Sequence, residues 1–463
     1  MTGAAKKWIH MVGIAGAGMS GIAKVLCEQG YKVSGSDLQP GKITNKLEEL
    51  GVTVYKGHSS SNLGEGVDLV VISSAVPQDN VEVKLARDRN IPVLKRGQML
   101  AHLVNTKKGI AVAGAHGKTT TTSMIYTILA EGGMDPSFIV GGELQGTDLN
   151  AKLGSGEYFV AEADESDASF LELKPYIAVV TNIEDDHLDY YKSFDNIRNA
   201  FKQFLKQINS FGLAVLFGGD ECNRQIKDQI QARAVLYGED PDYDYFLKNW
   251  QPNGLGSAFE SYSKKEGYLG KVELSIPGKH NALNAMAGIA VARETGISMD
   301  RVRDALLKFQ GARRRFQIMG NKGKLIVVDD YAHHPTEIKA TIEAARNSHQ
   351  GRLIVVFQPH RYSRTRILGR QLGEALVKAD LVIITDVYSA GEPALEGVSG
   401  EIVFKAALDA GGNTIYIPGK QEIENYLLEN SREGDLIITM GAGDIWQSGL
   451  NFLKKIPESV LKV

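Results

Sequence analysis

Two short glycine-rich segments of this 463-residue chain have the residue types and spacing that phosphate binding requires. One of them, Gly114–Thr120 (GAHGKTT), follows the apolar run GIAVA and precedes an apolar helical segment, TSMIYTILAEGG. A strand, a loop and a helix in this order direct backbone N–H groups and the helix N-terminus at phosphate oxygens. A helix terminus contributes only about 1–2 kcal/mol toward an anion, so Lys118 must supply further charge and Thr119 a hydroxyl for Mg²⁺. The loop is shorter than the usual Walker pattern, because Val112 stands where that pattern has its first glycine.

Acidic residues and one histidine follow the next two apolar runs, where they could hold the metal ion. The run YFVAEAD ends in Glu162 and Asp164 and is followed by Glu165, and IAVVTNI is followed by acids and His187. In a parallel sheet the carboxyl ends of the strands line the ligand site. Mg²⁺ prefers carboxylate oxygen. An isolated histidine is more often a structural residue whose ring nitrogens are hydrogen-bonded. The position of His187 among acids nevertheless favours a role as a metal ligand.

The other glycine-rich segment comes first along the chain. It lies near the N-terminus, between the run WIHMVGI and a helical segment. It reads Gly16-Ala17-Gly18-Met-Ser20-Gly21, and its small residues would let a diphosphate approach the backbone. Asp37, at the end of the next apolar run, could hold a ribose hydroxyl as in NAD enzymes. A nicotinamide oxidoreductase is therefore one hypothesis, and glycines that serve only helix packing are another. The pattern identifies a diphosphate rather than a nicotinamide.

Basic and aromatic residues dominate two segments of the C-terminal third. Asp330 and His333 follow the run KLIVVDDY, and His360, Arg361 and Arg364 follow RLIVVFQP. Two arginines at a strand end suit a carboxylate or a phosphate through forked hydrogen bonds. The segment Arg313–Phe316 is either a solvated basic turn or a group that reaches the γ-phosphate when domains close.

Apolar runs alternate with helical segments in three blocks and predict an α/β protein of three domains. We place the boundaries near 107 and 313, giving domains 1–107, 108–313 and 314–463. The first is expected to be Rossmann-like, the second a phosphate-loop α/β domain, and the third a Rossmann-like α/β domain with five strands. Between Tyr237 and Ile276, short aromatic and glycine-rich segments predict an antiparallel insertion, and a helix follows from His280 past Arg293.

Composition excludes several classes of protein. Hydrophobic residues make up 43% and charged residues 23%, which excludes disorder as the main character, and the net charge of −3 gives no general attraction to nucleic acid or an anionic membrane. The chain begins MTGAAKK without an apolar signal segment, has only Cys27 and Cys222, and contains no apolar run long enough to span a membrane. We expect a cytoplasmic protein without disulfides, either a monomer or a homodimer.

Eight segments together resemble the Mur ligases, in order and over essentially the whole chain: IAGAGMSGIA, GAHGKTTTT, EADESDASF, TNIEDDHLDYY, PGKHNALNA, RRRF, DDYAHHPTEI and FQPHRYSRT. The last segment resembles the alanine-adding branch of that family more than the branch that reattaches a recycled peptide. The resemblance implies an ATP-dependent ligase that joins L-alanine to the lactyl carboxylate of UDP-N-acetylmuramate through an acyl phosphate, in peptidoglycan precursor synthesis. A regulatory UDP-sugar-binding module with an inactive ATP site is a third possibility.

The resemblance also implies roles for individual residues. Lys118, Glu162, His187 and Arg315 are expected to be catalytic, with Thr119, Glu162 and His187 as Mg²⁺ ligands. The expected ATP contacts are Gly114, Ala115, His116, Gly117, Lys118, Thr119, Thr120, Asn182, His280, Asn284, Arg315 and Asp330. The expected substrate contacts are Gly16, Ala17, Gly18, Ser20, Asp37, His58, Ser73, Ser74, Ala75, Tyr331, His333, His360, Arg361 and Arg364. Some members of the family carry a carbamoylated lysine, and no lysine here lies in a motif that identifies it.

Overall fold

The computed structural model describes residues 7–146 and 149–456, so the predicted absence of an N-terminal signal segment concerns residues that lie partly outside it. By its internal contacts the chain divides into two compact units. The first comprises Met1–Lys248, Glu260–Gly270 and Leu283–Leu306, and the second comprises Asn249–Phe259, Lys271–Ala282 and Leu307–Val463. Among the described residues, no helix combines the length and the apolar character needed to cross a membrane.

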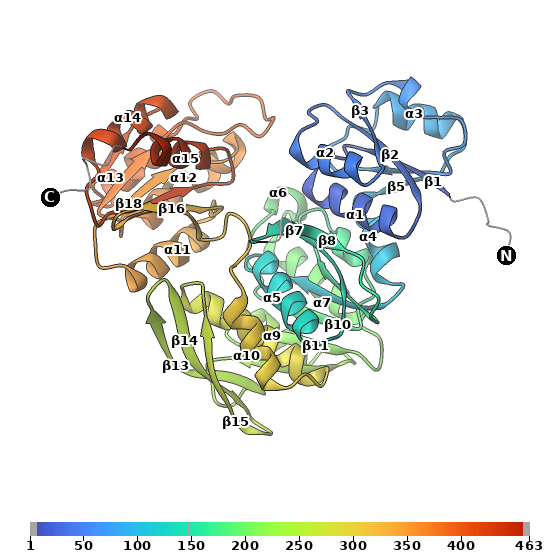
Figure 1. Ribbon diagram of the computed structural model, residues 1–463, viewed down its shortest axis with the longest axis horizontal. Coiled ribbons are helices and arrows are strands. Elements are labelled where there is room, and N and C mark those ends of the chain that lie inside the picture. The colour runs from blue at the N-terminus through green and yellow to red at the C-terminus, as the bar shows by residue number, and fades with distance from the viewer. Residues whose placement is uncertain (1–6, 147–148, 457–463) are drawn as a thin grey trace. The chain divides into compact units, whose positions relative to one another are not determined.

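The N-terminal sheet, blue in Figure 1, has five parallel strands in the order β3-β2-β1-β4-β5. The order reverses between β1 and β4, and ligands of doubly wound sheets bind outside the carboxyl ends of the strands at such a point. Alternate residues of the strands contribute to two different cores, Met11 and Val71 to one and Val12 and Val70 to the other, because helices cover both faces. Its strands are β1 (Trp8–Val12), β2 (Lys32–Asp37), β3 (Thr53–Lys56), β4 (Leu69–Ile72) and β5 (Val93–Lys95), and its helices are α1 (Ala17–Glu28), α2 (Lys42–Glu49), η1 (Ser60–Asn62), α3 (Val81–Asp88) and α4 (Arg96–Val104).

The central sheet has ten strands in the order β15-β14-β13-β12-β11-β10-β6-β9-β7-β8. Strands β12, β11, β10, β6, β9 and β7 pair in parallel, and β8 pairs with β7 in the antiparallel sense. The strands are β6 (Lys108–Ala113), β7 (Ser137–Leu144), β8 (Leu149–Lys152), β9 (Tyr158–Glu162), β10 (Ile177–Val180), β11 (Leu213–Phe217), β12 (Arg233–Gly238), β13 (Tyr245–Asn253), β14 (Gly256–Ser263) and β15 (Gly267–Leu274). The helices of this stretch are α5 (Lys118–Glu131), η2 (Ser169–Glu172), α6 (Leu188–Tyr191), α7 (Phe194–Lys206), α8 (Glu221–Lys227), α9 (Lys279–Glu294) and α10 (Met299–Lys308).

The C-terminal sheet, orange to red in Figure 1, has six strands in the order β16-β17-β21-β18-β19-β20. All pairs are parallel except β16 with β17. Val355 and Phe357 face one core and Ile354 and Val356 face the other, as expected for a sheet covered on both faces. Its strands are β16 (Gln317–Lys322), β17 (Leu325–Asp330), β18 (Leu353–Phe357), β19 (Leu381–Ile384), β20 (Thr414–Tyr416) and β21 (Leu436–Met440), with helices α11 (Pro335–Ser348), α12 (Tyr362–Leu376), α13 (Glu401–Asp409), α14 (Lys420–Asn430) and α15 (Trp446–Lys455).

The structure corrects the predicted count of five strands in the third domain, because β16 adds a sixth, antiparallel edge strand. Strands β3, β7, β8 and β12 are likewise present but were not predicted. Strands β3 and β8 lie at sheet edges and carry few strongly apolar residues, so their sequences lack the continuous apolar run of a central strand. Strands β7 (SFIVGGEL) and β12 (RAVLYG) lie inside the sheet and do have short apolar runs, which were overlooked in the sequence. The alternation of strands and helices in three α/β blocks is confirmed.

Candidate active site

The loop Gly114–Thr120 connects β6 to α5, as the motif predicts. Gly114 has φ +137°, and a Cβ there would lie 2.0 Å from the hydroxyl oxygen of Thr181, so only glycine fits. Gly117 has φ +80° and directly precedes α5, and a Cβ there would lie 2.9 Å from Oδ1 of Asn284. Asn284, an expected ATP contact, therefore lies against the loop.

The side chain of Lys118 is held by three acceptors. Its Nζ donates to the carbonyl oxygens of Gly114 (2.6 Å) and Ala115 (3.1 Å) and to Oε1 of Glu165 (2.7 Å). Burial lowers the pKa of Lys118, but the charges of Glu165 and Glu162 outweigh burial and raise it. Burial raises the pKa of the Glu165 carboxyl to about 7, although Lys118 opposes this. Lys118 is thus a charged ammonium beside the loop, hydrogen-bonded to the Glu165 carboxyl.

The acids predicted to hold the metal ion lie next to the loop. Oε2 of Glu162 accepts hydrogen bonds from the Thr119 hydroxyl and from the backbone N–H of Gly141, both at 3.0 Å. A hydroxyl and a carboxylate at this separation are hard oxygen donors of the kind that Mg²⁺ takes. Nε2 of His187 lies 3.6 Å from Oε1 of Glu165 and 3.6 Å from Oδ2 of Asp186, so the imidazole belongs to the same acidic group. Thr119 and Glu162 fit Mg²⁺ as oxygen donors, and His187, which lies beside Glu165 and Asp186, would be a less usual nitrogen ligand.

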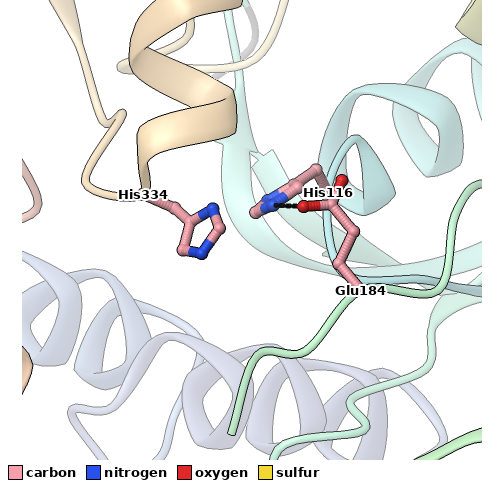
Figure 2. A group of neighbouring side chains, drawn as sticks. All are labelled: His116, Glu184 and His334. Atoms are coloured by element: carbon pink, nitrogen blue, oxygen red, sulfur yellow. Dashed lines mark ion pairs between the residues drawn. The ribbon is translucent and has the colours of Figure 1, made fainter. Parts of the chain in front are cut away.

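The loop is tied to the end of strand β10 by Asn182. Its Oδ1 accepts the backbone N–H of His116 at 2.8 Å. The His116 ring also faces the neighbouring segment, with Nε2 3.4 Å from Oε2 of Glu184, as Figure 2 shows. Asn182 therefore supports the loop directly, and Glu184 is one of the acids that follow the run IAVVTNI, to which the sequence assigned no individual role.

A cavity of about 290 Å³ joins the first glycine loop to the metal-site acids. All of it lies in the first compact unit. Its lining includes predicted residues of both nucleotide sites: Gly16, Ala17, Gly18, Ser73, Ser74 and Glu162. The turn after β1 and the turn after β4 face this cavity, which places it at the point where the strand order reverses. The first predicted anion site and the predicted metal ligand Glu162 thus open onto one space.

Arg96 lines the same cavity and was missed in the sequence. It is the first residue of α4, directly after β5, and its Nη2 donates to Oδ2 of Asp164 at 2.8 Å and lies 3.9 Å from Oδ2 of Asp167. A Cβ on Gly18 would lie 3.3 Å from the Arg96 side chain, so this glycine leaves room for the guanidinium. A basic residue directly after a strand, on the same sheet edge as the glycine loop, was the signal that could have identified it.

Other glycine-loop residues have structural partners. A Cβ on Gly21 would lie 3.3 Å from Ile139 and 3.4 Å from Ala151, so this glycine does allow close packing, of α1 against β7 and β8. Ser20 donates to the carbonyl oxygen of Ala17 and accepts from the side chain of Asn150. The packing function that the sequence offered as an alternative is thus present at Gly21.

Asp37, His58 and Ala75 do not line the cavity. Oδ2 of Asp37 accepts the backbone N–H of Ala15 at 3.0 Å, so Asp37 orders the start of the glycine loop. His58 follows β3, and its Nδ1 lies 2.9 Å from the Ser36 hydroxyl. The N–H of Ala75 donates to the Ser73 hydroxyl at 3.4 Å. Their expected contacts with the substrate stay predictions.

The predicted residues of the third domain gather beyond the carboxyl ends of β17 and β18. Asp330 accepts backbone N–H groups of Phe316 (2.7 Å) and Ala332 (2.8 Å), and burial raises its pKa to about 6 although Arg315 opposes this. Nη1 of Arg315 donates to Oε1 of Glu337 at 3.1 Å. Asp330 therefore shapes the turn that presents Arg315.

Aromatic rings line the same group of loops. Tyr331 contacts His333 edge to face with centroids 5.4 Å apart, and His333 contacts His360 at 5.9 Å. Burial, aided by Arg364, lowers the pKa of His333 to about 4 despite Glu337. Burial also lowers the pKa of His360 to about 3. Both rings are neutral at pH 7.

Arg361 and His280 complete the predicted set in the second unit. Arg361 precedes α12 with φ +66°, and its backbone N–H donates to the carbonyl oxygen of Tyr388 at 2.8 Å. His280 lies in the first turn of α9, and burial, followed by the charge of Arg315, lowers its pKa to about 4. It is a neutral hydrogen-bonding group at pH 7.

Comparison with known proteins accounts for all three sheets. Models of the Mur ligase family match in order: its catalytic domain over residues 8–108, its middle domain over 112–292 and its glutamate ligase domain over 314–443. The chain is 67% identical, over 99% of its length and 99% of the relative's, to a UDP-N-acetylmuramate--L-alanine ligase of Syntrophomonas wolfei.

Solved structures agree. A UDP-N-acetylmuramate-alanine ligase of Thermotoga maritima is 30% identical with a TM-score of 0.83, and 97% of this chain and 99% of that one are covered. A murein peptide ligase of Psychrobacter arcticus is 27% identical with a TM-score of 0.71 over the same shares. These relationships replace the oxidoreductase hypothesis. A first glycine loop that shares a cavity with Glu162 and Asp164, on a three-domain α/β chain with a second glycine loop after β6, is thus found in a protein that belongs to the Mur ligase family.

Proposed function

We propose that this chain is an ATP-dependent ligase that joins L-alanine to the lactyl carboxylate of UDP-N-acetylmuramate, a step in peptidoglycan precursor synthesis. The observation that carries the proposal is the 67% identity, over 99% of both chains, to a relative named for that reaction. The cavity shared by the first glycine loop and Glu162 supports it, because the sugar-nucleotide substrate and ATP must meet for the reaction to occur.

A carboxylate is a poor electrophile, so its activation by ATP is the chemical problem. The lactyl carboxylate oxygen attacks the γ-phosphorus of ATP, the bond to the β-phosphate oxygen breaks, and ADP and an acyl phosphate form. The neutral amine of L-alanine then attacks the acyl carbon, and inorganic phosphate leaves as the amide forms. Each step moves negative charge between oxygens rather than creating a bond to the protein, so electrostatic stabilisation is the main requirement.

The residues of the candidate site meet that requirement. Lys118 lies at the loop as a charged donor and can exchange Glu165 for a phosphate oxygen. We assign Mg²⁺ to Thr119, Glu162 and His187, where the ion would add positive charge to the transferring phosphoryl group. We assign Arg315, Asp330, His280, Asn182 and Asn284 to ATP, and the group Tyr331, His333, His360, Arg361 and Arg364 to L-alanine and the muramoyl moiety.

Phosphate release tests the proposed reaction. Purified protein should release phosphate only when ATP, Mg²⁺, UDP-N-acetylmuramate and L-alanine are all present, and the product should contain one alanine. A higher rate with a murein tripeptide than with L-alanine would instead assign the chain to the reaction of the peptide-recycling relatives. Sugar-nucleotide binding without any turnover would indicate a regulatory module and contradict the proposal.

A further inference from the structure

A chain of buried polar side chains lies beneath the sugar-nucleotide end of the N-terminal sheet. It comprises His10 on β1, Ser34 and Ser36 on β2, Glu82 in the first turn of α3 and His58 after β3. The side chains of His10 and Glu82 are completely buried, whereas His58 is 16% exposed. Buried polar groups of this number are costly unless every one is paired, so the direction of each hydrogen bond matters.

Glu82 is the common acceptor of this network. Its Oε2 lies 2.6 Å from the Ser36 hydroxyl and 3.1 Å from Nε2 of His10. Its Oε1 accepts the backbone N–H of Ser59 at 2.9 Å and the side-chain amide of Asn62 at 2.7 Å. Burial raises the pKa of Glu82, but the hydrogen bonds from these four groups outweigh it and lower the pKa to about 2. The side chain is an ionised carboxylate that can only accept.

An ionised Glu82 determines where the protons of its neighbours lie. The single hydroxyl proton of Ser36 points at the carboxylate, because an oxygen lone pair 2.6 Å from a carboxylate oxygen would be repelled. The Ser36 oxygen can then only accept from Nδ1 of His58, which lies 2.9 Å away. His58 therefore carries its proton on Nδ1. In the neutral ring this leaves the lone pair on Nε2.

The other branch of the network is directed at the same carboxylate. Nε1 of Trp8 donates to the Ser34 hydroxyl at 2.8 Å, and the Ser34 hydroxyl lies 2.9 Å from Nδ1 of His10. His10 in turn donates from Nε2 to Glu82. This branch ends in the protein interior and does not involve His58.

The position of His58 connects the network to the ligand end of the sheet. His58 follows β3, and the N–H of the preceding Gly57 donates to the carbonyl oxygen of Asp37 at 2.7 Å. Asp37 in turn accepts the N–H of Ala15, directly before the first glycine loop. His58 therefore stands on the same sheet edge as the loop assigned to the sugar nucleotide.

We propose that Glu82 is a positioning residue of the sugar-nucleotide site: through Ser36 it fixes the tautomer and orientation of His58, so that Nε2 of His58 accepts a hydrogen bond from an N–H or O–H of the nucleoside. The proposal rests on the proposed function for the identity of the ligand. The tautomer itself does not depend on that function, so the two can fail separately.

The tautomer is tested in the full-length protein by ¹⁵N NMR of uniformly ¹⁵N-histidine-labelled enzyme at pH 8.5, with His58 assigned from a His58→Gln variant. Wild-type protein should show a protonated Nδ1 and an unprotonated Nε2 for His58. Ser36→Ala removes the acceptor and should convert His58 to a mixture of tautomers. A protonated Nε2 in the wild type would overturn the proposal, whether or not the enzyme is a ligase.

The consequence for binding is tested with the same variant. Ser36→Ala should raise KM for UDP-N-acetylmuramate about tenfold, the effect of one lost hydrogen bond to the ligand, while kcat and KM for ATP stay within about twofold. Ser34→Ala is the matched control: it lies on the same strand, is equally buried, and touches only the Trp8 and His10 branch. Equal changes in both variants would indicate a general packing effect and refute the proposal.

Two further measurements complete the test. Glu82→Gln should give the KM effect of Ser36→Ala or a larger one, and His58→Gln should add little in a Ser36→Ala background, because both act through one contact. The donor on the ligand is identified by competition with UDP, N3-methyl-UDP and 2′-deoxy-UDP. Wild-type protein is expected to bind one of the two analogues more weakly than UDP, and this difference should be smaller in Ser36→Ala. Equal binding of UDP and both analogues by the wild type would contradict the acceptor role of His58.

Discussion

At the scale of single residues, Lys118 is the clearest determinant of chemistry. Its ammonium is held by Glu165 and two carbonyls of the loop that we propose binds the phosphates of ATP. Lys118→Ala should lower kcat at least a thousandfold, because the main protein charge opposite the transferring phosphoryl group is lost. UDP-N-acetylmuramate binding, measured by calorimetry, should remain within about twofold of wild type. A Lys118→Ala protein that retains a tenth of the rate would contradict the assignment.

Arg96 makes a separate prediction, because it lines the cavity beside the first glycine loop. Arg96→Gln should weaken binding of UDP-N-acetylmuramate by one to two orders of magnitude, since a guanidinium near a diphosphate makes charge-assisted hydrogen bonds. The affinity for ATP should change much less. Arg87→Gln, on the exposed face of α3, is the control and should bind as the wild type does. Unchanged affinity in Arg96→Gln would assign this arginine to the pairing with Asp164 alone.

At the scale of elements, the connection from β6 to α5 depends on a backbone that only glycine tolerates. Gly114→Ala should raise KM for ATP at least tenfold and lower the melting temperature, because its Cβ would collide with Thr181 and φ is +137°. Gly41→Ala is the control: Gly41 precedes α2 with φ −166°, and its Cβ would meet nothing within 4 Å. The two variants are compared by thermal unfolding and steady-state kinetics. Equal changes in KM for ATP and in melting temperature would mean that neither ATP binding nor stability depends on the backbone geometry at Gly114.

The loops after β17 and β18 make stability depend on pH. His333 has a pKa of about 4 in the folded protein, mainly through burial, against about 6.5 in an unfolded chain. As pH falls from 6.5 to 4, the unfolded state gains a proton that folded His333 does not. This proton uptake lowers the free energy of unfolding, by about 3 kcal/mol at pH 4.

Thermal unfolding between pH 7 and pH 4 measures the effect. The melting temperature of His333→Asn should fall less than that of wild type between pH 7 and pH 4. His102→Asn, which removes an exposed histidine on α4, should follow the wild-type curve. Parallel curves for wild type and His333→Asn would show that the imidazole is protonated in the folded protein.

At the scale of the whole molecule, the shared cavity predicts that the two nucleotides influence each other. Two polyphosphates that approach one space repel, and Mg²⁺ bound at Thr119 and Glu162 would offset the repulsion. In calorimetry without Mg²⁺, UDP-N-acetylmuramate should weaken binding of a non-hydrolysable ATP analogue severalfold, and Mg²⁺ should reduce or reverse this. The factor by which UDP-N-acetylmuramate changes the affinity for the ATP analogue must equal the factor by which the analogue changes the affinity for UDP-N-acetylmuramate. Uridine, which has no phosphate, should show no coupling, and coupling that is independent of Mg²⁺ would contradict a common site.

The sequence by itself determined the α/β class, both glycine loops and the acids beside them, because each is a local pattern: an apolar run, a turn that needs glycine, and polar residues at a strand end. Edge strands such as β3 and β16 were not predictable in this way, since their burial depends on neighbours distant in the chain. The family resemblance supplied the residue roles, and these stay predictions.

Only the tertiary structure decided which of these patterns meet. Arg96 reaches Asp164 across 68 positions, and Glu82 collects hydrogen bonds from β1, β2 and the segment after β3. Neither contact leaves a periodic signal, because a salt bridge or a buried hydrogen bond depends on the distance between atoms and not on separation along the chain. The sequence therefore specified the parts of the nucleotide sites, and the packing of two sheets in the first unit brought the glycine loop after β1 and the acid after β9 to one cavity.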